Sequence, residues 1–193
     1  MKPLIRKFLI VSSFALAATV ARADSGFQFG FWAPDLQLVD ASEDIRGVRI
    51  DLVYGENNNF TGFDFGILGV GVTRGDFEGF AWSWGGVTNG NATGVLWQGF
   101  YSSVDGQFSG WQGALVGRLN GESAGLQTSF VGLVDGSLRG VQFGFFNKAN
   151  EVRGLQLGFV NWAENLYGVQ IGLINYAKNS DLFPVFPIVN WSF

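Results

Sequence analysis

Three consecutive segments repeat one pattern: Gly140-Val-Gln-Phe-Gly-Phe-Phe-Asn147, Gly154-Leu-Gln-Leu-Gly-Phe-Val-Asn161 and Gly168-Val-Gln-Ile-Gly-Leu-Ile-Asn175. Toward the N-terminus, an equivalent glycine recurs every 14–17 residues back to Gly47. Within each unit, bulky apolar residues alternate with Gly and Gln, and this period of two predicts a β-strand. Pairs such as Asn89-Gly90 separate the units and are typical of hairpin turns. We expect twelve strands, starting near residues 26, 36, 45, 60, 77, 92, 107, 123, 137, 152, 166 and 183.

The composition narrows the function classes. The chain has 193 residues, no Cys and no His, and only 15% of its residues are charged. Its length is that of one domain. Without Cys and His, a thiolate nucleophile, a His general base and the usual metal sites cannot be built. We therefore expect no enzyme, no catalytic residues, no cofactor and no metal.

The segment over 1–23 has the features of a secretory signal peptide. Lys2, Arg6 and Lys7 precede a short apolar run over 8–20, and Ala21-Arg22-Ala23 fits a cleavage site. The segment over 24–193 then forms a single repeat-built domain. Removing the four basic residues of the signal from the chain's twelve leaves eight against sixteen acidic residues, a net charge of −8. Nucleic acid is thus not an expected partner.

Two architectures use this pattern. The first is an up-and-down antiparallel transmembrane β-barrel, whose bulky face meets the lipid bilayer and whose Gly/Gln face lines a lumen. The alternative is a parallel β-solenoid of coils about fifteen residues long, with the bulky face inside and the Gly/Gln face in water. Recurrent Gln and Asn favour the solenoid because amides stack in ladders. Three aromatics in one unit, Phe80, Trp82 and Trp84, favour the barrel because they would overfill a narrow coil.

In the barrel, polar residues of the Gly/Gln face are candidates for lining the lumen and contacting small neutral solutes. They are Arg49, Asp51, Asp64, Gln28, Gln112, Gln127, Gln142, Gln156 and Gln170. The charged three are expected to form an interior salt-bridge network. Some apolar residues fall on the same face, so they either plug the lumen or mark a break in strand parity. They are Leu68, Phe100, Val116, Val131, Phe146, Val160 and Ile174.

The last eleven residues, Phe183-Pro-Val-Phe-Pro-Ile-Val-Asn-Trp-Ser-Phe193, alternate and end in an aromatic residue. This segment resembles the terminal strand of bacterial outer-membrane barrels. The resemblance implies that Trp191 and Phe193 form a signal for the outer-membrane assembly machinery, and it implies a location in the bacterial outer membrane. Pro184 and Pro187 depart from the pattern because proline removes a donor from the strand ladder.

From Gly110 to Phe193 the chain also resembles the Gly-x-Gln-x-Gly-x-x-Asn surface repeats of uncharacterised secreted bacterial proteins, including some from spirochaetes. That family implies a place in the cell envelope but no activity. The first functional hypothesis is an outer-membrane barrel that acts as a passive, porin-like channel or a structural surface protein. The second is a secreted or surface-attached solenoid with an adhesive or binding role.

Overall fold

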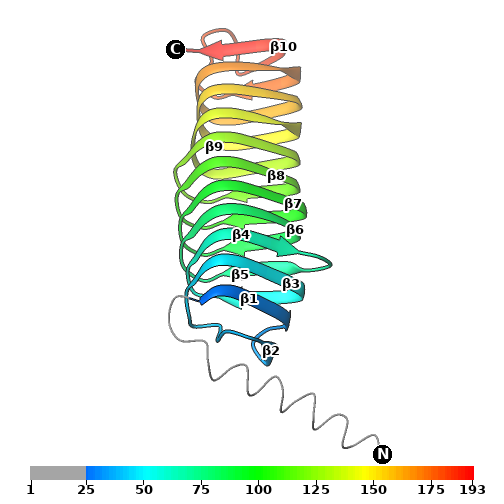
Figure 1. The fold of residues 1–193 in the computed structure, drawn as a ribbon. Helices are drawn as coiled ribbons and strands as arrows, with labels where there is room; N and C mark the ends of the chain where they lie inside the picture. The colour runs from blue at the N-terminus through cyan, green and yellow to red at the C-terminus, as the bar shows by residue number, and fades with distance from the viewer. Residues whose placement is uncertain (1–24) are drawn as a thin grey trace, which may run out of the picture.

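The structure is a computed structural model that describes residues 25–193, and the predicted signal peptide over 1–23 lies outside these residues. The described chain is all β and winds into a column of stacked coils, a β-solenoid, with its two ends at opposite ends of the column (Figure 1). Among the described residues, no helix is long and apolar enough to span a membrane.

The described residues form ten strands in one sheet system and not the twelve that we expected, because the expected starts near 137, 152 and 166 lie inside one continuous strand over 123–177. Their bounds are β1 Ser25–Trp32, β2 Leu36–Gln37, β3 Ile45–Asn57, β4 Phe60–Gly66, β5 Val70–Thr73, β6 Phe77–Thr88, β7 Ala92–Val104, β8 Phe108–Leu119, β9 Ser123–Ala177 and β10 Val185–Ser192. From β1 to β9, pairing along the column is parallel, apart from the short β2. The antiparallel barrel predicted from the sequence is therefore wrong, and the parallel solenoid is the fold.

Nearly equal repeat lengths explain this outcome. Equivalent residues of successive units lie side by side in register, as Gly62 does with Gly79 and Gly79 with Gly94. The Asn-Gly and Asp-Gly pairs are solenoid corners and not hairpin turns: Gly90 N–H donates to Gly75 O at 3.0 Å, and Gly106 N–H to Gly90 O at 3.0 Å. These corners lead each coil onto the next one along the column.

Nine stacked glycines open the coils and have φ between +124° and +152°, a range that L side chains rarely adopt. They are Gly47, Gly62, Gly79, Gly94, Gly110, Gly125, Gly140, Gly154 and Gly168. A Cβ at Gly140 would lie 2.0 Å from the Gly125 carbonyl oxygen in the coil below. The repeating glycine thus allows both this backbone conformation and the close approach of neighbouring coils.

The interior combines apolar columns with polar ones. Apolar side chains form one buried cluster along the column, to which Phe60, Phe77, Leu119 and Val134 belong. The Gln side chains at the repeat position also point inward, and Gln112, Gln127, Gln142, Gln156 and Gln170 are fully buried. The bulky aromatic face points outward and the Gly/Gln face points inward. The sequence analysis expected the reverse for a solenoid. The smaller Gly and Gln side chains fit a narrow coil better than Phe and Trp do.

Both ends of the column carry antiparallel strands. β2 pairs with β1 at the N-terminal end, and β10 pairs with the last coil of β9 at the C-terminal end. The register of β10 shifts between Phe186 and Ile188, the two neighbours of Pro187. This shift fits the expected weakening of the strand ladder by proline.

Candidate interaction face

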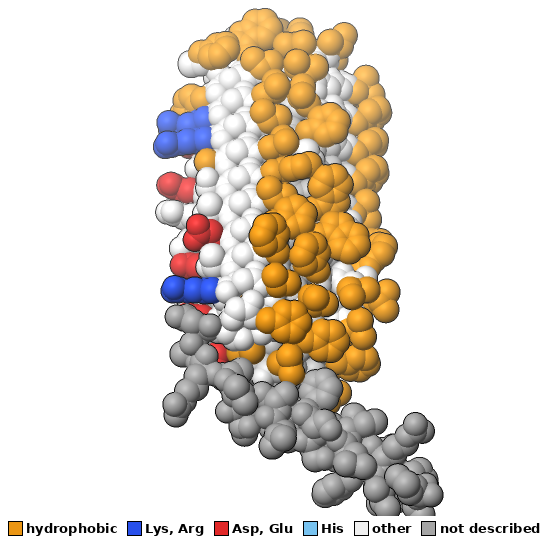
Figure 2. Space-filling view, in the orientation of Figure 1, with side chains coloured by type: hydrophobic (Ala, Val, Ile, Leu, Met, Phe, Trp, Pro, Cys, Tyr) orange, Lys and Arg blue, Asp and Glu red, His pale blue; other side chains and the backbone are white. Residues whose placement is uncertain are grey.

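Large hydrophobic side chains cover one side of the solenoid along its length. Figure 2 shows them as a broad orange surface, separated by a white band from an edge with Lys, Arg, Asp and Glu. We define the apolar face by fifteen exposed residues: Phe63, Ile67, Leu68, Trp82, Trp84, Trp97, Phe100, Leu115, Phe130, Phe143, Phe145, Phe159, Ile171, Leu173 and Ile174. At roughly 100 Å² for each half-exposed large side chain, the face is on the order of 1,500 Å². Typical monomers expose apolar patches of about 300–600 Å².

The apolar face turns around a corner of the coil. Leu173 and Ile174 are consecutive yet 54% and 47% exposed, and Ile67 and Leu68 are 47% and 70% exposed. Consecutive residues of a straight strand point to opposite sides, so the chain must bend between them. The interpretation that strand parity breaks at Leu68, Phe100 and Ile174 is correct, and these side chains lie outside the coil and do not plug it.

Aromatic rings stack from coil to coil along this corner. Phe130, Phe145 and Phe159 form a continuous stack with centroids 4.9 Å apart and planes within 9° of parallel. The Trp84 indole N–H donates to the Ile67 carbonyl oxygen at 3.0 Å, so this exposed ring is fixed in place. Beside the Phe stack runs an open depression bounded by the column Phe143, Leu157 and Ile171. The result is an apolar groove parallel to the column axis.

The Gln residues predicted to line a lumen lie in the packed interior. Each amide Nε2 donates to the Oε1 of the preceding coil: Gln127 to Gln112 and Gln142 to Gln127 at 2.8 Å, and Gln156 to Gln142 and Gln170 to Gln156 at 2.7 Å. Gln28 is buried in the first strand, where its Oε1 accepts the Val39 N–H at 2.8 Å. This ladder satisfies buried amides in the interior of the coil.

Arg49, Asp51 and Asp64 are brought together near the N-terminal end of the interior. Arg49 forms two hydrogen bonds to Asp64, from Nε at 2.9 Å and from Nη2 at 2.8 Å, and its Nε lies 3.3 Å from Asp51 Oδ2. All three side chains are buried, and the guanidinium also lies 4.6 Å from the centre of the Phe60 ring. The residues meet because Arg49 and Asp64 are register partners of β3 and β4.

Two carboxylates share this one buried cation. Burial raises the pKa of Asp51 to about 7; Arg49 acts in the opposite direction, and Asp64 raises it further. Burial alone would lower the pKa of the Arg49 guanidinium, but Asp64 and Asp51 outweigh burial and raise it. Neither oxygen of Asp51 has a hydrogen-bond partner in the structure, which fits a carboxyl group that holds its proton more tightly than usual.

The proposed assembly-signal residues lie at the C-terminal end of the column. Trp191 belongs to β10 and pairs in register with Val169, and Phe193 is 85% exposed beyond it. Their geometry is that of a strand covering the last coil. Whether assembly machinery reads them stays a prediction.

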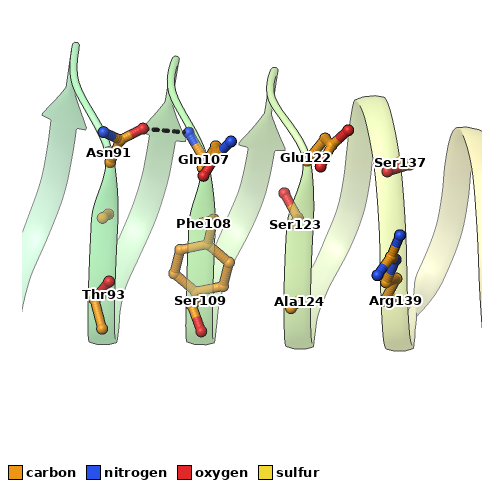
Figure 3. A pocket seen from close by; sticks show the side chains of 11 residues that line it. Asn91, Thr93, Gln107, Phe108, Ser109, Glu122, Ser123, Ala124, Ser137 and Arg139 are labelled. Atoms are coloured by element: carbon orange, nitrogen blue, oxygen red, sulfur yellow. Dashed lines mark hydrogen bonds between the residues drawn. The ribbon is translucent and has the colours of Figure 1, made fainter.

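A polar depression of about 330 Å³ lies on the charged edge (Figure 3). Hydroxyl and amide side chains line it together with Glu122 and Arg139. The amide oxygen of Asn91 accepts the Gln107 N–H at 2.9 Å, so part of its polar lining is used to join neighbouring coils. The depression is therefore part of the charged edge, and its hydroxyl groups distinguish it chemically from the apolar face.

The recurrent asparagines form a second buried ladder, which the solenoid alternative anticipated, although the sequence analysis did not place it in the interior. Asn147 Nδ2 donates to Asn161 Oδ1, and Asn161 Nδ2 to Asn175 Oδ1, each at 2.8 Å. The recurrent Asn at the end of each repeat was the available signal, because the same spacing that stacks the glutamines also stacks these amides. These asparagines lie beyond the parity break, which hid their inward direction.

Comparison with protein-family models, curated proteins and solved structures finds no match to this chain.

Proposed function

We propose that this protein is a surface-attached β-solenoid of the bacterial envelope that works by binding through its apolar face. The observation that carries the proposal is the continuity of that face over β4, β6, β7, β8 and β9. An exposed apolar surface of this size is typical of an interaction site. Stacked coils keep it rigid, so little conformational entropy is lost on binding.

A binding role fits this architecture better than a channel does. The polar residues that would have lined a pore are hydrogen-bonded to one another in a packed interior, as in the ladder from Gln112 to Gln170. The chemically distinctive surface is on the outside of the coil. The adhesive or binding hypothesis therefore replaces the porin-like one.

Cell fractionation tests this function. In the native bacterium, we expect the wild-type protein in the envelope fraction and a Phe143→Asp variant shifted to the soluble fraction. Phe143 is 55% exposed and belongs to the apolar face, so a charge there weakens binding without entering the core. Ser109→Asp is the matched control, because Ser109 is exposed on the charged edge. Equal envelope retention of all three proteins would refute the proposed function.

A further inference from the structure

We infer that the partner of the apolar face is the hydrocarbon of a lipid leaflet: the solenoid lies along a membrane with its apolar corner inserted. This inference rests on the proposed function and names its partner. It identifies a membrane-surface protein that embeds one side without crossing the bilayer.

The chemistry of the face favours lipid over protein. Between the stacked glycines and the corner, outward positions of the repeats from Phe63 to Ile174 hold no Asp, Glu, Lys or Arg. Protein–protein interfaces carry about one hydrogen bond per 100–200 Å² and surround their apolar centre with polar groups. A surface on the order of 1,500 Å² without charged groups matches acyl chains, which offer no hydrogen bonds.

The shape of the face fits a fluid partner better than a flat one. Leu173 and Ile174 project to different sides of the same corner, and both are about half exposed. A second solenoid packed on one side would leave the other side in water. A stable dimer needs only about 800 Å² from each partner, so a large part of the apolar face would stay in water. A fluid leaflet surrounds a convex corner and covers both sides together.

The groove beside the Phe stack provides the local fit. It runs along the column between Phe130, Phe145 and Phe159 on one side and Phe143, Leu157 and Ile171 on the other. Its walls are apolar, and Gly144 and Gly158 are among the residues that line it. An extended acyl chain lying against the inserted corner fits this linear apolar groove.

Charge does not drive this attachment. The chain has a net charge of −4, and the fifteen residues of the apolar face contribute none of it. We therefore expect binding to uncharged phosphatidylcholine vesicles, and we expect that binding to persist in 1 M salt, where the Debye length falls to about 3 Å.

The test is flotation of the purified protein with phosphatidylcholine vesicles in low and high salt. We expect wild type to float equally in both, Phe145→Asp/Leu173→Asp to bind at least tenfold more weakly, and Thr61→Asp/Ser109→Asp to bind like wild type. Thr61 and Ser109 are exposed outside the apolar face, and Thr61 is the register partner of Arg46. A circular-dichroism spectrum verifies the fold of each variant.

A second readout covers a variant that fails to fold. Trp82, Trp84 and Trp97 belong to the apolar face, so lipids brominated on their acyl chains should quench wild-type tryptophan fluorescence. Absence of both flotation and quenching overturns the lipid partner, as does binding that needs anionic lipid and is lost in high salt. If the lipid partner is overturned but envelope retention still depends on Phe143, the proposed function survives. A dimer in light scattering then identifies a second copy of the chain as the partner.

Discussion

Gly140 shows how a single residue decides whether two coils can stack. Its φ is +142°, and an added Cβ would lie 2.0 Å from the Gly125 carbonyl oxygen. We expect Gly140→Ala to lower the free energy of unfolding by more than the roughly 1–3 kcal/mol typical of backbone strain alone. Gly113→Ala is the control, since its nearest contact, Thr128 Oγ1 at 3.4 Å, is an ordinary one. Equal urea midpoints for both variants would contradict this account.

A single residue, Asp51, makes the free energy of unfolding depend on pH. Its pKa is raised by burial from 3.8 to about 7, so the folded protein binds a proton that the unfolded chain releases between these values. The stabilisation that protonated Asp51 contributes is fully present below about pH 4 and is lost as the pH rises toward 7. Asp51→Asn, which stays neutral, should flatten that part of the profile. Urea unfolding at pH 5 and pH 8 measures the difference, and an unchanged slope in the variant would exclude Asp51 as its source.

The Gln ladder acts at the scale of secondary-structure elements, because it links neighbouring coils in the interior. Gln142→Leu leaves Gln127 Oε1 without its donor and Gln156 Nε2 without its inter-coil acceptor. Each unpaired buried group costs about 1–3 kcal/mol. Gln170 stands at the end of the ladder and its Oε1 has no partner, so Gln170→Leu disturbs one ladder bond. We expect Gln142→Leu to be the more destabilising in thermal unfolding, and the reverse order would show that the ladder contributes little.

For the whole molecule, the parallel stacking predicts proximities that an antiparallel meander cannot produce. Thr61 and Glu78 are register partners on neighbouring coils. Neighbouring strands lie about 4.8 Å apart, so Thr61→Cys/Glu78→Cys should form a disulfide. The described chain has no cysteine of its own to compete. In a meander, these positions would lie at opposite strand ends, and failure of the disulfide under oxidising conditions would contradict the parallel register.

A control for this geometry is Thr61→Cys/Ser109→Cys. The two positions are three register steps apart along the column. That separation is well beyond the roughly 7 Å between Cα atoms that a disulfide can bridge. We expect no intramolecular crosslink in this variant on a non-reducing gel, and an efficient one would indicate that the coils slip or that the chain is not stably folded.

The amino-acid sequence by itself determined the repeat, most of the strand positions and the places where the chain turns, but not that these turns join parallel coils. Predicted starts at residues 45, 60, 77, 92 and 123 are confirmed, and the start predicted near 107 lies at Phe108. The period of two also grouped Gln112 to Gln170 on one face and Phe143, Leu157 and Ile171 on the other. These features follow from local geometry, because alternation and turn residues act within a few positions of the chain.

Only the tertiary structure decided how strands pair and which face is inside. Alternation places Gln156 and Leu157 on opposite faces, but it does not state which face meets the interior. That choice depends on contacts between coils that are distant in the chain, where stacked glycines permit close approach and the amides of Gln142 and Gln156 bond to each other. The narrow coil accepts these small and hydrogen-bonded groups and a few aromatics such as Phe60 and Phe77. Most of the bulky aromatics remain outside, because several in one coil would overfill the interior.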